Sequence, residues 1–200
     1  IGREDRLSEV SGASGWATAI TEISAKLKEA QPGSVAIVGG ARQTNEELYL
    51  LKKLANKLEA ITDSAPRKGQ GDKLLSCPDK NSNSTGSRLI GIANEELGSR
   101  FAEIAQGIED GTITSLIVFG DDVTKHGINE ALLDKLDLLV VSDILPNTTT
   151  SKAHYLLPGC AHTEKRGTFT NVKGQVQKIM KALDAPGDAR AEWEFLHELV

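Results

Sequence analysis

The sequence predicts an α/β fold: a doubly wound, mostly parallel sheet with helices on both faces, a small C-terminal hairpin and a terminal helix. Short aliphatic and β-branched runs alternate along the chain with segments whose apolar residues recur at helical spacing. The runs are apolar throughout, which is typical of parallel strands that are covered on both faces. Glycine, serine or aspartate follows them directly, as expected where loops leave the carboxyl ends of parallel strands.

Composition places the chain among ordinary globular proteins. Its 200 residues are 39% hydrophobic and 26% charged, and its two cysteines are too few for a disulfide scaffold. The net charge of −5, without any block of Lys or Arg, argues against a nucleic-acid partner. We also expect no direct membrane insertion, because no apolar run approaches the roughly 20 residues needed to cross a bilayer. The start at Ile1 suggests a processed chain or a piece of a longer one.

The N-terminal part predicts half of a βαβ unit. A helix over residues 15–30 is indicated by apolar residues at steps of four, three and four: Trp16, Ile20, Ile23 and Leu27. Residues 34–38 form a short apolar run that is typical of a buried strand, and Gly39-Gly40 ends it. Thr44 and Glu47 have the spacing of a capping box, which predicts the start of the next helix.

The alternation continues after a long loop, and we expect all 200 residues to form one domain. Residues 62–87 are rich in Gly, Pro, Asn, Ser and Lys and lack periodicity, so they predict a loop that covers a site or is mobile. The later elements are expected in this order: a helix over 95–108, strands over 115–119 and 136–141 separated by a helix over 129–135, a short strand over 155–157, a hairpin over 167–171 and 175–179, and a helix over 189–199. If Gly174 in the hairpin turn has a positive φ, Gly174→Val is expected to destabilise the fold.

The glycine loop after the first strand is one candidate binding feature. Gly39 and Gly40 precede a helix whose N-terminus could hold a phosphate. The loop completes neither the dinucleotide pattern nor the phosphate-loop pattern, however, and a tight structural turn is the favoured interpretation.

Carboxylates at two other strand ends are a second candidate feature. Gly120-Asp121-Asp122 and Ser142-Asp143 place acidic groups where one could hold a ribose or the edge of a guanine. Asp121 or Asp122 could equally serve only to cap the following helix. Both interpretations stay open.

No metal site or catalytic residue is predicted. Cys77 and Cys160 are far apart, and the four histidines lack the spacing of metal ligands. His162 and Glu164 could in principle activate Cys160 as a nucleophile, but three near neighbours in a sequence rarely converge on one point.

Several motifs give the chain a specific family resemblance. The longest comprises Leu157-Pro158 followed by residues 164–177, and weaker ones lie at residues 16–20, 36–47, 83–86 and 186–193. Together they resemble the molybdopterin oxidoreductase family over nearly the whole chain. The closest resemblance is to the C-terminal part of the large iron–sulfur subunit of NADH:quinone oxidoreductase (respiratory complex I).

Departures from the family pattern indicate which branch fits. Gln175 stands where the family usually has an arginine, which removes a guanidinium suited to an anionic cofactor. The regions that supply the metal-binding Cys, selenocysteine or Ser and the cysteine-rich cluster motif are also missing. The resemblance therefore implies a non-catalytic scaffold piece that holds no cofactor itself, while iron–sulfur clusters outside it carry the electrons. Its implied partners are the other subunits of the peripheral arm and N-terminal iron–sulfur domains, on the cytoplasmic side and membrane-associated through the complex.

Two other functions remain open. The chain could be a piece of a formate-dehydrogenase-like molybdoenzyme, in which case residues at the strand ends would line the nucleotide end of molybdopterin guanine dinucleotide: Gly39, Gly40, Gly120, Asp121 and Asp143. It could also be a stand-alone adaptor that keeps the fold only for protein binding. Whether the piece belongs to a working enzyme is therefore left open.

Overall fold

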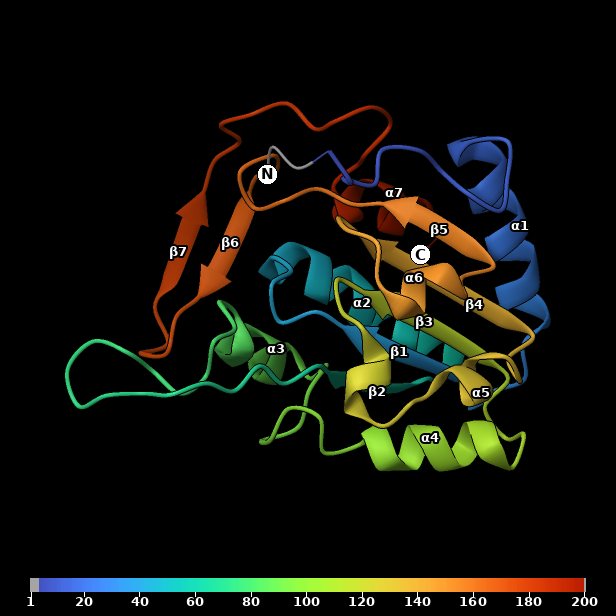
Figure 1. Cartoon of the computed structure of the whole chain (residues 1–200), viewed down its shortest axis with the longest axis horizontal. Coiled ribbons are helices and arrows are strands. Elements are labelled where there is room, and N and C mark those ends of the chain that lie inside the picture. The colour runs from blue at the N-terminus through green and yellow to red at the C-terminus, as the bar shows by residue number, and fades with distance from the viewer. Residues whose placement is uncertain (1–3, 200) are drawn as a thin grey trace.

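The computed structural model describes residues 4–199 and is built around a five-stranded parallel sheet (Figure 1). The strands lie in the order β2-β1-β3-β4-β5, and every neighbouring pair is parallel. Their bounds are Val35–Gly39 (β1), Ile61–Ser64 (β2), Ser115–Phe119 (β3), Leu138–Asp143 (β4) and Tyr155–Pro158 (β5). The chain runs outward from β1 to β2 and then crosses back to β3, so the strand order reverses between β1 and β3. In open α/β sheets this reversal is where ligands bind.

Helices cover both faces of the sheet, as the sequence predicted. They are α1 (Trp16–Glu29), α2 (Asn45–Leu58), α3 (Ser84–Ile90), α4 (Phe101–Glu109), the short 3-10 helix η1 (Val123–His126), α5 (Glu130–Leu133), α6 (Thr148–Ser151) and α7 (Glu192–Leu199). Helices α1, α2 and α7 pack on one face, whereas α4, α5 and η1 pack on the other. Ile37 and Val38 illustrate the period-two alternation, because they enter the two opposite cores. None of the helices within residues 4–199 is long and apolar enough to span a bilayer.

An aromatic cluster attaches the terminal helix to the sheet. The ring of Phe195 lies 5.1 Å from the ring of Trp16 and 6.2 Å from that of Phe119, measured between centroids. Phe195 is completely buried, and burial of such a side chain contributes about 1.5–3 kcal/mol to stability. Helix α7 is therefore part of the main core.

The prediction that residues 62–87 form one long loop is wrong at both ends. Residues 61–64 are strand β2, and residues 84–90 are helix α3. The search for apolar runs does not detect strand β2, because its buried side chains are polar. Hydrogen bonds compensate for their burial. The Asp63 carboxylate accepts the N–H groups of Gly98 and Arg100 at 3.0 and 2.7 Å.

The same carboxylate explains why the helix predicted over 95–108 starts only at Phe101. Asp63 holds the N–H groups of residues 98 and 100 in a turn that leads into α4. The strand predicted over 136–141 is also shifted, to 138–143, because Ser142 and Asp143 continue the pairing with β5.

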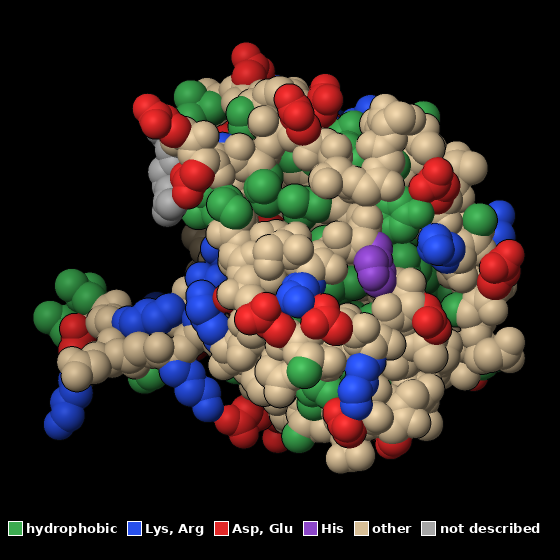
Figure 2. Space-filling view, turned by 45° about the vertical axis from the view of Figure 1, so that its right-hand side comes forward, with side chains coloured by type: hydrophobic (Ala, Val, Ile, Leu, Met, Phe, Trp, Pro, Cys, Tyr) green, Lys and Arg blue, Asp and Glu red, His purple; other side chains and the backbone are tan. Residues whose placement is uncertain are grey.

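The remainder of the loop, residues 66–82, forms an arm that projects from the globular body (Figures 1 and 2). Its two sides are joined by hydrogen bonds such as Gly69 N–H to the Pro78 carbonyl and Lys80 N–H to the Arg67 carbonyl, both 2.9 Å. Leu74 and Leu75 at its tip are 85% and 90% exposed. This segment is thus an ordered arm with an apolar end.

The predicted C-terminal hairpin is confirmed as β6 (Gly167–Thr170) and β7 (Val176–Ile179), which pair antiparallel. It is attached to the N-terminal end of α2. The Glu46 carboxylate accepts from the Thr168 N–H at 2.8 Å and from its hydroxyl at 2.9 Å. The Asn83 side-chain oxygen accepts the Thr170 N–H at 2.8 Å.

Gly174 in the hairpin turn has φ +79°, so Gly174→Val is expected to strain the backbone by about 1–2 kcal/mol. A Cβ there would meet no described atom within 4 Å, so the cost is conformational rather than steric. Thermal unfolding should show a melting temperature roughly 2–8 °C below that of the unmodified chain. Gly174→Asn is the control and should lose less, because asparagine tolerates this conformation. Equal melting temperatures for Gly174→Val and the unmodified chain would contradict the prediction.

Candidate functional site

The carboxyl edge of the sheet contains a cavity of about 270 Å³ at the strand-order reversal. Three of the predicted site residues line it: Gly40 after β1, Gly120 after β3 and Asp143 at the end of β4. The segments that follow β1, β3 and β4 therefore lie together, as expected for parallel strands that end at one edge of a sheet. Gly39 and Asp121, which were predicted to join them, do not line the cavity.

The Gly39-Gly40 loop is the tight structural turn that the sequence favoured. A Cβ on Gly40 would lie 2.6 Å from the Phe119 carbonyl oxygen, so the loop after β1 presses directly on the end of β3. The Gly40 N–H donates to the side-chain oxygen of Gln43 at 3.0 Å, within the loop itself. This close approach requires glycine and places Arg42, whose guanidinium donates to the Gly120 carbonyl.

The N-terminus of α2 is capped by its own side chains. The predicted capping box is present: the Thr44 hydroxyl accepts the Glu47 N–H at 3.3 Å, and the Glu47 carboxylate accepts the Thr44 N–H at 2.8 Å. The Glu47 carboxylate thus lies at the positive end of the α2 dipole, the position where a phosphate would otherwise be favoured.

A buried ion-pair cluster, which the sequence did not predict, lies behind this cap. Lys165 Nζ donates to both Glu47 carboxylate oxygens at 3.0 and 2.8 Å and to Glu192 Oε2 at 2.8 Å. The side chains of Lys165, Glu47 and Glu192 are only 3%, 0% and 6% exposed. We call these three residues the Lys165 cluster. It joins α2, the segment before β6 and the start of α7.

The two carboxylates of the Lys165 cluster differ in acidity. Burial and the nearby charge of Glu47 raise the pKa of Glu192 to about 8, and the attraction of Lys165 only partly opposes them. Burial is the largest single influence on Glu47 and acts to raise its pKa, but the charge of Lys165 together with the hydrogen bonds from Glu192, Lys165 and the Thr44 N–H outweighs it and lowers the pKa of that carboxyl. We therefore assign the proton that the pair holds near neutral pH to Glu192.

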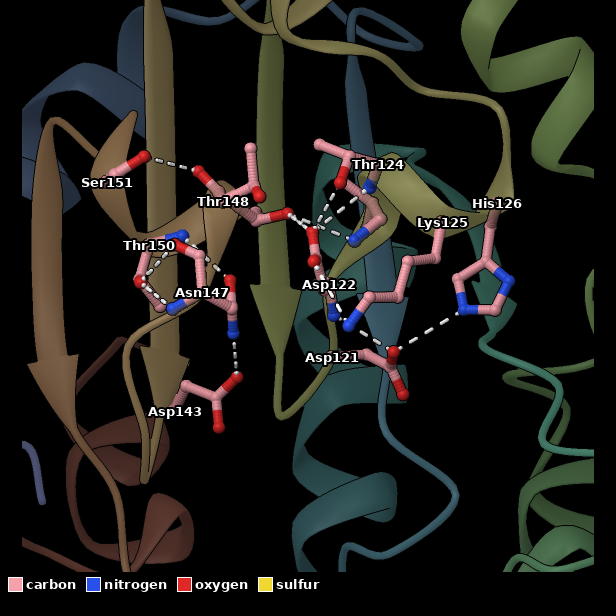
Figure 3. Close-up of polar contacts among 12 residues, drawn as sticks. Asp121, Asp122, Thr124, Lys125, His126, Asp143, Asn147, Thr148, Thr150 and Ser151 are labelled. Carbon is pink, nitrogen blue, oxygen red and sulfur yellow. Dashed lines mark hydrogen bonds and ion pairs between the residues drawn. The ribbon is translucent and has the colours of Figure 1, made fainter. Parts of the chain in front are cut away.

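The acidic pair after β3 serves the local structure (Figure 3). Asp122 caps η1 by accepting from the Thr124 N–H and hydroxyl at 3.3 and 2.7 Å, as one of the two open interpretations required. Asp121 accepts from Arg67 at 3.0 Å and lies 3.4 Å from His126 Nε2. Burial opposes ionisation of Asp121, but these partners outweigh it and lower its pKa. Asp121 therefore anchors the base of the arm.

Asp143 is the predicted carboxylate that does face the cavity. Its oxygens accept the Ile144 N–H at 2.6 Å and the Asn147 side-chain amide at 2.8 Å, and Asn147 in turn caps α6 (Figure 3). Burial raises the pKa of Asp143, although these donors and Arg42 oppose the change. Each carboxylate oxygen keeps a further lone pair, so Asp143 can accept from a ligand.

Gln43 supplies an unused donor at the same cavity. Its side-chain oxygen is taken by Gly40, whereas its Nε2 is buried and has no hydrogen-bond partner among the described residues. The side chain as a whole is 3% exposed. Buried polar groups are normally paired, so this amide and Asp143 together suit a small polar ligand with both an acceptor and a donor. The cavity lies just below the range of about 300–1,000 Å³ that is typical of pockets for drug-sized ligands.

Cys160 does not have the surroundings of an activated nucleophile. Burial, followed by the charges of Glu192 and Glu164, raises the pKa of its thiol to about 12. Glu164 instead pairs with Arg6 at 2.7 Å and accepts the Ala161 N–H at 2.8 Å. In the described part of the chain, no three His, Cys, Asp or Glu side chains are grouped so that they could hold a metal ion.

A parallel sheet with a cavity at its strand-order reversal places the chain in the class of doubly wound α/β folds, in which ligands bind at this position. The chain belongs to the molybdopterin oxidoreductase family, whose sequence model matches residues 67–200. This confirms the family predicted from the motifs.

Individual relatives are much longer proteins. The chain is 37% identical over 118 residues to the NADPH-Fe(3+) oxidoreductase subunit alpha of Geobacter sulfurreducens, which covers 57% of this chain and 14% of that protein. It is 29% identical over 195 residues to a Staphylococcus aureus protein named "Putative formate dehydrogenase", with coverages of 92% and 19%. Among solved structures, acetylene hydratase from Pelobacter acetylenicus aligns with a TM-score of 0.45 and 18% identity, over 50% of this chain and 15% of that one. The chain thus spans less than a fifth of the length of these proteins.

Stability should fall as the pH rises from about 5 to about 8. Because the pKa of Glu192 is raised to about 8 in the fold, the folded state binds more protons than the unfolded state over this interval. The expected loss from Glu192 is on the order of 3–4 kcal/mol, measured as the free energy of urea unfolding at several pH values. The substitution Glu192→Gln should make stability nearly independent of pH over this interval. The control Glu194→Gln, at an exposed position nearby, should leave the pH dependence unchanged. A Glu192→Gln profile that declines as steeply as the unmodified chain would refute the assignment.

Proposed function

We propose that this chain is a non-catalytic scaffold domain of the large iron–sulfur subunit of a respiratory NADH:quinone oxidoreductase. The observation that carries the proposal is the internal neutralisation of the α2 N-terminus by Glu47 and the Lys165 cluster. A phosphate bound at this helix would have to displace a buried, paired carboxylate, and breaking such a pair is costly. At this helix N-terminus the Lys165 ammonium, which could attract an anionic cofactor, is already paired with Glu47 and Glu192.

The C-terminal hairpin supports the same proposal. Gln175, which replaces the family's usual arginine, lies in the exposed turn, where its N–H donates to the Asn171 side-chain oxygen at 3.1 Å. A neutral amide at this position offers no fixed guanidinium for a phosphate. In this role the chain holds neighbouring iron–sulfur domains and peripheral-arm subunits in place. The complex would keep it on the cytoplasmic side of the membrane, and electrons would move through clusters outside these residues.

The similarity to longer proteins is compatible with a structural role for this chain within a larger enzyme. One of them is named as an oxidoreductase subunit and another as a putative formate dehydrogenase, and this chain spans 14% and 19% of their lengths. The redox activity that such names describe belongs to the whole protein. For this chain we propose the scaffold role alone.

A second candidate function is binding of the nucleotide end of molybdopterin guanine dinucleotide. The unpartnered Gln43 amide and the accepting Asp143 carboxylate favour it, because a guanine edge carries both acceptors and donors. The cavity fits a base more readily than a whole dinucleotide, and the α2 N-terminus is closed to phosphate. In this function Gly40, Gly120, Gln43 and Asp143 would hold the base, and the bound group would supply the redox chemistry.

Calorimetric titration of the chain with millimolar GMP distinguishes the two functions. The scaffold function predicts no binding heat, because the site that would take the phosphate is already neutralised. The second function predicts saturable binding that is lost in Asp143→Asn and kept in Asp137→Asn, a matched change at an exposed aspartate of the opposite sheet edge. Saturable binding with this pattern would overturn the scaffold proposal.

A further inference from the structure

A second and larger hollow, of about 730 Å³, lies between the C-terminal hairpin and the helical face of the body. We call it the hairpin groove. Its lining residues come from α2, the end of α3, the hairpin and α7: Asn45, Glu46, Tyr49, Leu50, Ile90, Arg166, Gly167, Thr168, Lys178 and Trp193. The hairpin groove shares no lining residue with the cavity at the sheet edge. Its function is therefore a separate question.

The hairpin groove has the composition of a protein-binding surface. Tyr49 is 59% exposed, Trp193 is half-buried, and Leu50 and Ile90 add aliphatic surface beside them. Binding energy at protein interfaces is concentrated in Trp, Tyr and Arg side chains that are surrounded by apolar contacts. Trp193, Tyr49 and Arg166 supply all three types here.

The hairpin groove is slightly basic, whereas the chain as a whole is acidic. Its charged lining residues are two cations, Arg166 and Lys178, and one carboxylate, Glu46, in a chain whose net charge is −5. Arg166 and Lys178 line the groove, and neither forms an ion pair with any described residue. Arg166 lies 5.6 Å over the Trp193 ring, which holds the guanidinium at the apolar surface.

The acidic side chain in the hairpin groove is already engaged. Glu46 accepts two hydrogen bonds from Thr168, and it forms no ion pair with Arg166 or Lys178 among the described residues. Asn45 also donates to the hydroxyls of Thr168 and Thr170 at 3.0 and 3.1 Å. The hairpin wall is thus fixed in place, and binding would require little reorganisation of the backbone.

We propose that the hairpin groove binds an acidic amphipathic segment of a partner protein. Apolar side chains of the segment pack on Tyr49, Leu50 and Trp193, while its carboxylates pair with Arg166 and Lys178. Charge complementarity selects an acidic partner over a second copy of this chain's basic hairpin. The inference goes beyond the proposed function, because it holds for a scaffold and for a cofactor-binding domain alike.

The test is selection from a display library of random peptides of roughly 16 residues, long enough for helical anchors at i, i+3, i+4 and i+7. The immobilised target is the whole chain. Selected peptides are then labelled, and their affinities are measured by fluorescence anisotropy against two variants of equal net charge. Arg166→Glu/Lys178→Glu reverses the groove cations, and Lys26→Glu/Lys53→Glu reverses two exposed cations on α1 and α2 outside the groove.

We expect the selected peptides to be enriched in Asp or Glu together with Leu, Phe or Trp. Their affinity should fall at least about tenfold for Arg166→Glu/Lys178→Glu and stay unchanged for Lys26→Glu/Lys53→Glu. Circular dichroism confirms that both variants remain folded. The proposal is overturned if no peptide is selected, if the selected peptides lack acidic residues, or if both variants bind alike. Self-association of the unmodified chain that Arg166→Glu/Lys178→Glu abolishes would also overturn it, in favour of a second copy as the occupant.

Discussion

The arrangement of the C-terminal half depends on one buried ammonium group. Lys165 Nζ lies between the carboxylate of Glu47 and the carboxyl group of Glu192, and all three side chains are withdrawn from water. Burying these charges is expensive, and the cost is offset only while every partner stays in place. The N-terminus of α2, the segment that enters the hairpin and the first turn of α7 are therefore constrained together.

The Lys165 cluster also separates two surfaces of different chemistry. Lys165 and Glu192 line the cavity at the sheet edge, whereas Arg166, the next residue, lines the hairpin groove. These two successive residues, which lie between a turn and the start of β6, thus face different hollows. The segment acts as a wall shared by the two hollows. On the side of the cavity, Lys165 is paired with buried acidic groups. On the side of the hairpin groove, the cations have no ion-pair partner among the described residues and lie beside aromatic side chains.

Local patterns predicted the elements that depend on local interactions. The capping box of α2 joins residues only three positions apart, and the buried strands β1, β3 and β4 are apolar throughout. Strand β2 was not predicted because its buried side chains are polar and give no apolar run. Hydrogen bonds to the Asp63 carboxylate compensate for its burial. The Lys165 cluster spans 118 residues to Glu47 and 27 to Glu192, so no local spacing could reveal it.

The candidate site was predicted in part for a similar reason. Gly40, Gly120 and Asp143 meet because parallel strands end at one edge, which the topology fixes. The Asp121 side chain points toward Arg67 and His126 instead. Arg67 is distant in the sequence and His126 lies beyond the following turn, so this orientation could not be predicted from local spacing. Gln43 gave no signal in the sequence, since its unused amide becomes evident only once Gly40 occupies its oxygen.

Hydrogen exchange of Lys165→Met, compared with the exposed control Lys53→Met, tests most directly whether Lys165 constrains these segments together. We expect the amides of β6, β7 and α7 to lose protection together, by at least about tenfold, while β1, β3 and β4 keep theirs. Protection of the hairpin and of α7 equal to that in the control variant would contradict this role of Lys165.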